Sequence, residues 1–145
     1  MKLARNIIDN LVEILGGIKI NRIEDKEAKS ALLKNFLALR KVAKEAEADR
    51  NEIVRKFQED WADEIPAIEK FRKAGEPVIG HLDYLEAERD ANKAIVEIFA
   101  NEVEVEIEPI RESPLYNPDC WDINIKVADI PGAIEYMKEI GIISK

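Results

Sequence analysis

The 145-residue chain contains one cysteine, Cys120, and one histidine, His81. A single cysteine excludes an intrachain disulfide and a cysteine zinc site, and it is easier to reconcile with a reducing compartment. A single histidine excludes a histidine-rich metal site and a Cys-His pair with spare partners. The sequence also has no Walker loop and no GxGxxG, GxSxG, HExxH or EF-hand pattern. We therefore predict no catalytic residue, no cofactor and no metal ligand, and we expect that the protein is not an enzyme.

Long apolar runs are missing as well. No run approaches the ~20 residues needed to span a bilayer. The N-terminal segment MKLARNIIDNLVEILGG carries Arg5, Asp9 and Glu13 on the face opposite its apolar residues, whereas a signal peptide has an uninterrupted apolar core. We expect a cytoplasmic protein with no membrane partner.

Charged residues are abundant and unevenly distributed. They make up 36% of the chain, beside 46% hydrophobic residues, which excludes a disordered chain and favours long solvated helices over a compact sheet protein. The length fits a single domain, residues 1–145. The net charge is −8, with 13 Lys and Arg against 11 Asp and Glu in residues 1–60, and 9 against 19 in residues 61–145. This acidic protein should repel nucleic acid overall, although its first half need not.

A long helix is predicted after residue 24, because no Gly or Pro occurs between residues 24 and 61. Apolar or seam positions recur there at alternating steps of three and four, as in a coiled coil: Leu32, Phe36, Leu39, Ala43, Ala46, Arg50, Ile53 and Phe57. Such a helix would be ~57 Å long and needs a partner helix, from its own chain or another. Residues 68–73 and 84–101 are also helical in pattern. We therefore predict an antiparallel helical hairpin over about 24–101, folded near residues 74–83.

After residue 101 the apolar period changes from 3.6 to 2. The segments 102–108 and 120–127 both alternate apolar and polar residues, and two such strands close in sequence most often pair antiparallel. A helix is expected before them, over residues 3–15, and another after them, over 129–141, with Asp129 as N-cap and Gly141 at its end. Residues 18–23 fit either a short strand or an extended connector. The predicted fold class is α+β, with a small β unit plus C-terminal helix over about 102–145.

Four glutamates share one face of the strand predicted at 102–108: Glu102, Glu104, Glu106 and Glu108. Alternate strand residues lie ~6.6 Å apart, too far for neighbouring carboxylates to share a Ca²⁺ or Mg²⁺ ion without ligands from elsewhere. The face is either a solvated outer surface or a docking surface for something basic. On an exposed edge it would also discourage aggregation between strands.

A stripe of one charge sign covers residues 26–44, where Glu27 is the only acidic residue among six basic ones: Lys26, Lys29, Lys34, Arg40, Lys41 and Lys44. On a helix they fall within an arc of ~140° and a length of ~27 Å. The stripe is a solvated helix face or a contact for an acidic protein surface, such as the glutamate face of another copy. Nucleic acid is disfavoured, because no aromatic residues interleave the stripe to stack bases. The candidate partner-binding residues are Lys34, Arg40, Lys41, Lys44 and the four glutamates.

Cys120 and His81 have structural interpretations. Asp119 and Asp122 should raise the pKa of the Cys120 thiol, and strand alternation places Trp121 in the core, so we predict a structural cysteine. His81 lies in the predicted turn, where it is either an ordinary surface histidine or part of a polar tip that contacts a partner.

Several segments, taken in order, resemble a family of small uncharacterised phage and prophage proteins. They are the opening helix, AKSALLKN within the long helix, the turn at residues 75–78, NEVEVEIEPI at 101–110, and the terminal AIEYMKEIGII. The resemblance implies an accessory or structural protein encoded by a phage or prophage, located in the bacterial cytoplasm or associated with the virion. It supplies no catalytic residues.

We expect a non-enzymatic protein that acts through a protein partner or self-association, with no evident small-molecule substrate. The alternative is a regulatory or anti-host protein that engages nucleic acid, or a nucleic-acid-binding protein, through the stripe at 26–44.

Overall fold

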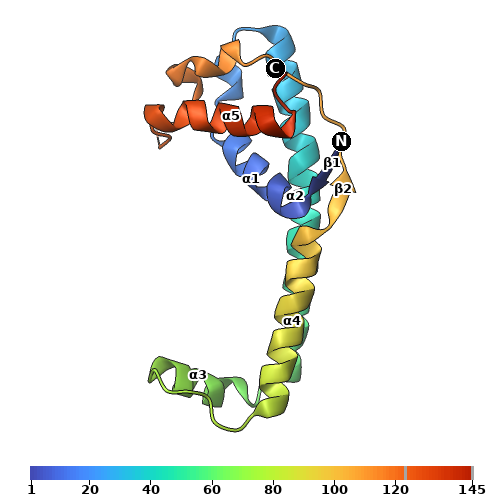
Figure 1. Cartoon of the computed structure of the whole chain (residues 1–145), viewed down its shortest axis with the longest axis vertical. Helices are drawn as coiled ribbons and strands as arrows, with labels where there is room; N and C mark the ends of the chain where they lie inside the picture. The colour runs from blue at the N-terminus through green and yellow to red at the C-terminus, as the bar shows by residue number, and fades with distance from the viewer. Residues whose placement is uncertain (123, 145) are drawn as a thin grey trace. The chain divides into compact units, whose positions relative to one another are not determined.

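The computed structural model describes residues 1–122 and 124–144 and is mostly helical (Figure 1). Its α-helices and strands are, in chain order, β1 (Lys2–Ala4), α1 (Arg5–Gly16), α2 (Lys26–Asp60), α3 (Ile65–Lys73), α4 (Leu82–Ala100), β2 (Glu102–Glu104) and α5 (Ile130–Ile140). Short 3₁₀ helices cover Ile20–Arg22, Ser113–Tyr116, Pro118–Cys120 and Val127–Asp129. The predicted long helix is confirmed as α2. No helix among the described residues is long and apolar enough to cross a membrane.

The chain divides into two compact units, which we call the terminal unit (residues 1–44 and 102–145) and the helical unit (residues 45–101). The terminal unit contains both strands, α1, α5 and the first part of α2. The helical unit contains the rest of α2, α3 and α4. The expectation of a single domain stays a prediction.

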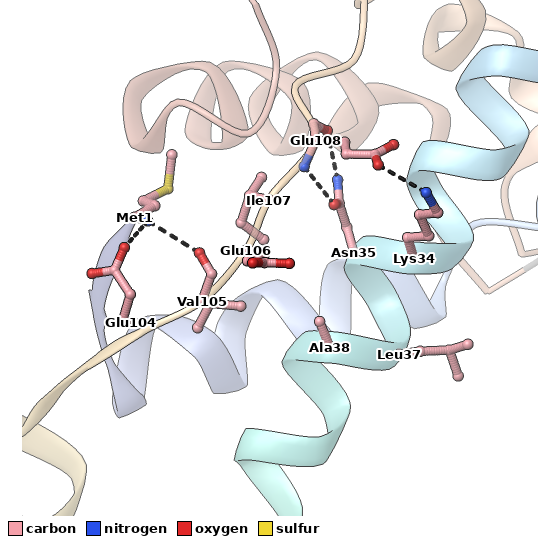
Figure 2. A pocket seen from close by; sticks show the side chains of 10 residues that line it. All are labelled: Met1, Lys34, Asn35, Leu37, Ala38, Glu104, Val105, Glu106, Ile107 and Glu108. Carbon is pink, nitrogen blue, oxygen red and sulfur yellow. Dashed lines mark hydrogen bonds and ion pairs between the residues drawn. The ribbon is translucent and has the colours of Figure 1, made fainter.

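The sheet of the terminal unit joins the two ends of the sequence. β1 pairs antiparallel with β2, with Leu3 opposite Val103. Val105 extends this pairing, because its N–H donates to the Met1 carbonyl at 2.9 Å and its carbonyl accepts from the Met1 nitrogen at 3.1 Å (Figure 2). The predicted pairing of 102–108 with 120–127 is therefore wrong for β2, and the helix predicted from Leu3 begins after β1.

The strand predicted over 120–127 is wrong for the described residues of that segment, which contain one isolated bridge at Trp121, a turn and the ends of two 3₁₀ helices. Three prolines and two 3₁₀ helices interrupt residues 109–120, and proline removes the backbone donor that a ladder needs. Trp121 instead makes one antiparallel bridge with Ile18, and its indole N–H donates to the buried Leu115 carbonyl at 2.7 Å. Residues 18–23 thus contribute a single bridge followed by a 3₁₀ helix. Ile123, part of the predicted second strand, lies outside the described residues.

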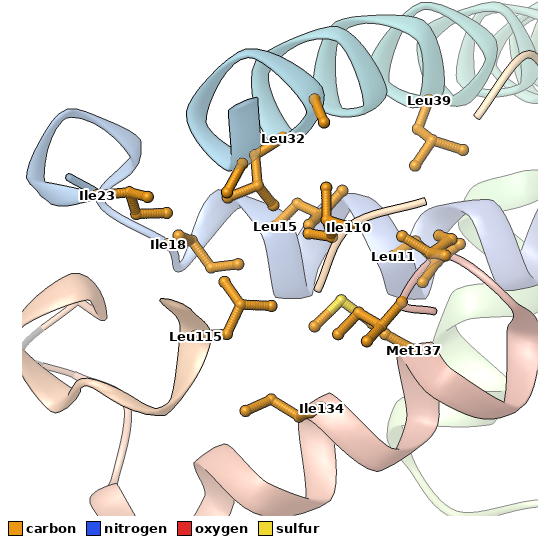
Figure 3. Packing of buried hydrophobic residues seen from close by; sticks show 14 of the residues in the cluster. Leu11, Leu15, Ile18, Ile23, Leu32, Leu39, Ile110, Leu115, Ile134 and Met137 are labelled. Carbon is orange, nitrogen blue, oxygen red and sulfur yellow. The ribbon is translucent and has the colours of Figure 1, made fainter. Parts of the chain in front are cut away.

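The hydrophobic core of the terminal unit lies where α1, the first part of α2 and α5 meet (Figure 3). Its fully buried members include Leu11, Leu15, Leu32, Leu39, Ile134 and Met137. α1 and α5 present the apolar faces that the helical spacing predicts. Trp121 is buried in this core, which confirms its predicted position. Ile110 also joins it and bridges in parallel to Ile143.

Local signals set the ends of two helices. The Asp25 carboxylate accepts from the backbone N–H groups of Glu27 and Ala28 at the start of α2, and these bonds hold the pKa of Asp25 below its usual value. At the end of α5, Gly141 adopts φ +100° and Ile142 N–H donates to the Met137 carbonyl, which confirms the predicted Schellman-type end. Asp129 precedes α5 but makes no side-chain capping bond.

The helical unit has little buried side-chain area. Its only buried residues are Ala46, Ile68 and Tyr84, in a segment that the structure describes throughout. The predicted turn between residues 74 and 83 is confirmed as the connection from α3 to α4, and it contains Gly75, Gly80 and His81 at positive φ. Three helices therefore occupy the segment for which a hairpin is predicted.

Candidate functional site

The four glutamates of 102–108 all point to solvent, while the residues between them point inward. Val105 is buried and Val103 and Ile107 are partly buried, so the alternation continues past the end of β2. Glu104 accepts a hydrogen bond from the Met1 nitrogen at 2.5 Å, and this bond, together with the positive charge of that nitrogen, holds the pKa of the Glu104 carboxyl below its usual value. Glu108 pairs with Lys34 at 3.0 Å.

Asn35 fastens this segment to α2. It is the one buried polar or charged residue among those described, with 1% of its surface exposed. Its side-chain N–H donates to the Glu108 carbonyl at 2.9 Å, and its side-chain oxygen accepts from the Glu108 N–H at 2.9 Å (Figure 2). The amide therefore bonds both backbone groups of Glu108, as a neighbouring strand would.

An open groove with a volume of about 720 Å³ lies beside residues 104–108. Residues 104–108 form one wall, and Lys34, Asn35, Leu37 and Ala38 of α2 contribute the other (Figure 2). Leu37 is 54% exposed, although most leucines of this unit are buried. The groove thus places the apolar side chains of Leu37 and Ala38 beside a row of carboxylates, with Lys34 and Asn35 next to Glu108.

The basic stripe is less uniform than its sequence suggests. Lys34 is neutralised by Glu108, and the Arg40 guanidinium lies 5.9 Å from the centre of the Phe36 ring, a cation–π arrangement. Lys41 and Lys44 are exposed, with no ion-pair partner in the part of the chain that the structure describes. The expected contact between basic stripe and glutamate face thus occurs within one chain at Lys34.

A second candidate surface lies in the helical unit, where α2, α3 and α4 line a groove of about 270 Å³. We call its partly buried apolar residues the apolar seam: Ile53, Val54, Phe57, Ile65 and Ile95. Tyr84 packs at its end, with ring centroids 5.2 Å from Phe57 and 5.8 Å from Trp61. Three large apolar residues of the helical unit are mostly exposed: Ile79 in the turn before α4 (74%), Leu82 at the start of α4 (76%) and Val96 within α4 (66%).

An ion pair joins α3 to α4, and a histidine–carboxylate contact joins the residues that directly precede these two helices. Arg72 donates to both carboxylate oxygens of Glu88, at 2.8 and 2.6 Å, and lowers the pKa of that carboxyl. His81 Nδ1 lies 3.0 Å from a Glu64 carboxylate oxygen. The predicted turn histidine therefore has a structural partner within the helical unit.

Cys120 has the structural role that its sequence context predicts. It is buried, its thiol donates to the Arg22 carbonyl at 3.7 Å, and burial together with Asp119 raises its pKa. A thiol of raised pKa is a poor nucleophile. Within the described residues, no three His, Cys, Asp or Glu side chains are arranged to hold a metal ion.

The sequence analysis did not predict the two hydrogen bonds of Asn35, whereas its heptad spacing had already placed the seam residues Ile53 and Phe57 on one face of the long helix. Asn35 lies three residues after Leu32 and four before Leu39, so a polar residue on the buried helix face was the available signal. A scan against protein-family models and searches of curated proteins and of solved structures found no match to this chain.

Proposed function

We propose that this chain is a non-enzymatic, phage-related protein that acts through protein–protein contacts, with the apolar seam as its main contact surface. The phage relation is supported by the sequence resemblance alone. The contact role is supported by one observation: the helical unit leaves most of its large apolar residues partly or fully exposed, whereas the terminal unit buries most of its own. Partly exposed apolar side chains on helices gain stability when a partner covers them.

In this proposal, the end of α2 and α4 run as an antiparallel helical hairpin. Tyr84 of α4 already contacts Phe57 of α2, and both helices contribute residues to the groove, together with α3. The steps of three and four along α2 are those of helices that pack in coiled coils. A second copy of this chain offers the same complementary spacing, so self-association is the proposed use of the seam.

Self-association predicts a dimer or larger assembly that the V96E substitution weakens. Val96 directly follows the seam residue Ile95 on α4 and is two-thirds exposed, so a carboxylate there would have to be desolvated where a partner covers this side of the helix. We expect dissociation constants at least about tenfold higher, from size-exclusion chromatography with light scattering over a hundredfold concentration range. K93E, which changes charge at an exposed polar position of α4, should leave the assembly intact. A wild-type chain that is monomeric throughout would contradict self-association.

The second candidate function uses the exposed cations Arg40, Lys41 and Lys44 to engage nucleic acid or a nucleic-acid-binding protein. These three side chains have no acidic ion-pair partner among the described residues, which favours an external one. Reversing all three to Glu should abolish salt-sensitive binding to labelled duplex DNA or RNA in an anisotropy titration. Wild-type protein that does not bind, or a variant that binds equally well, would exclude direct nucleic-acid contact through this stripe.

A further inference from the structure

Residues 102–106 have one backbone edge that no described strand covers. The only strand paired with β2 in the described structure is β1. Val105 and Met1 exchange both of their backbone hydrogen bonds on that side. Backbone groups of successive strand residues point to opposite edges, so the N–H and C=O of Glu104 and Glu106 face away from β1. No backbone hydrogen bond involves Glu106 in the described chain.

Asn35 shows that this edge accepts strand-like partners. Glu108 is the next residue whose backbone faces the same way as Glu106, and both of its groups bond the Asn35 amide. The helix α2 therefore supplies a substitute for a neighbouring strand at one position only. The adjoining positions, Glu106 and Glu104, lie beside the open groove (Figure 2).

The groove has the composition that an added strand requires. Side chains of an added strand alternate between the two faces of the sheet. On one face they would meet Glu104 and Glu106, and on the other they would meet the apolar side of the groove at Leu37 and Ala38. An exposed leucine beside a free strand edge gives such a segment both main-chain bonds and an apolar contact.

The negative charge of the glutamates indicates which kind of segment could bind at this edge. A second copy adding its own β2 would set glutamates opposite glutamates, which is unfavourable for directly opposed strand residues. Nucleic-acid phosphates would meet the same repulsion. Glu102 and Glu106 have no ion-pair partner in the described part of the chain. A segment that alternates Lys or Arg with apolar residues complements both faces.

We propose that the free edge at Glu104 and Glu106 binds an extended basic segment of another protein by strand addition. The Lys or Arg side chains of that segment face the glutamates, and its apolar side chains contact Leu37 and Ala38. This surface lies in the terminal unit and is separate from the apolar seam, so it goes beyond the proposed self-association and can succeed or fail independently of it.

The test uses a fluorescein-labelled peptide, KVKVKVK, with blocked ends, titrated with the full chain and followed by fluorescence anisotropy. We expect saturable binding to the wild type that weakens at high salt. E106K should raise the dissociation constant at least about tenfold, and E106Q should raise it less. E139K makes the same charge change at an exposed position of α5 and should change it by less than about twofold.

Two further measurements separate strand addition from simple charge attraction. A peptide of the same composition in which the lysines and valines are grouped instead of alternating, KKKKVVV, should bind at least about tenfold more weakly. N-methylation of alternate residues should abolish binding when it removes the N–H groups that face the edge, and spare it when it removes the others. Amide hydrogen exchange should slow at Glu104 and Glu106 in the complex but not at Val105, which is already bonded to Met1.

Absence of wild-type binding at low salt would overturn the proposal. Equal binding of KVKVKVK and KKKKVVV would overturn it as well, because charge attraction alone would then explain the affinity. Binding that survives both N-methylation patterns, or exchange protection confined to the helical unit, would do the same. None of these results bears on the V96E experiment, which reports on contacts made by α4 in the helical unit.

Discussion

Replacing Asn35 with Asp should destabilise the terminal unit by about 3 kcal/mol at neutral pH, because the substitution buries a charge and removes a hydrogen bond. The Asn35 side chain is 1% exposed and its N–H lies 2.9 Å from the Glu108 carbonyl oxygen. An ionised Asp has no proton to donate, so two oxygen atoms would face each other there. Urea unfolding followed by circular dichroism measures the loss.

The pH dependence of the N35D variant gives a sharper test. Once protonated, the introduced carboxyl can donate to the Glu108 carbonyl and accept from its N–H, as the amide does. The folded state should therefore raise the pKa of the new carboxyl above the unfolded value of ~3.9. The deficit relative to wild type is then full above the folded pKa and shrinks as pH falls through it.

N92D is the matched control, because Asn92 is exposed on α4 and makes no side-chain hydrogen bond within the described structure. It should change the free energy of unfolding by less than about 0.5 kcal/mol. An N35D deficit that is as small as that of N92D, or that does not shrink on acidification, would show that the two bonds to Glu108 contribute little.

Replacing Leu39 with Ala should cost about 3 kcal/mol of unfolding free energy, since Leu39 is fully buried in the core of the terminal unit. Part of the loss is transfer free energy, and part is the cavity that remains. L37A removes the same atoms two residues away on α2, where the side chain is 54% exposed.

Comparing L39A with L37A isolates the effect of side-chain burial on the free energy of unfolding, because both substitutions make the same change of helix propensity in one helix. We expect the L37A loss to stay below about 0.5 kcal/mol in the same urea titration. Similar losses for the two variants would contradict the position of the core along α2.

Periodicity predicted the elements that depend on local patterns. The uninterrupted stretch after residue 24 became α2, the alternation at 102–108 became an exposed acidic face, and Gly141 ended α5 as its conformation allows. In each case the residues that decide the structure lie within a few positions of one another. The position of Trp121 in the core followed from the same alternation.

The strand partner could not be predicted in this way. Closeness in sequence favoured residues 120–127 as the partner of 102–108, but β1 lies about a hundred positions from β2. β1 contains three residues, too few to show an alternating pattern. The ion pair between Lys34 and Glu108 is also remote in sequence, so the sequence could match a basic patch to an acidic patch but not one residue to another.

The Asn35 side chain bonds the main chain of Glu108 and not its side chain. The two positions should therefore tolerate substitution to different extents. Any residue other than proline supplies the same N–H and carbonyl at position 108, so that side chain is free to drift and to follow the chemistry of a partner. Position 35 has no such freedom. Its side chain must be of the right length to donate one hydrogen bond to the backbone of residue 108 and to accept another from it. Divergence should therefore accumulate on the acidic surface while the amide that holds its backbone stays unchanged.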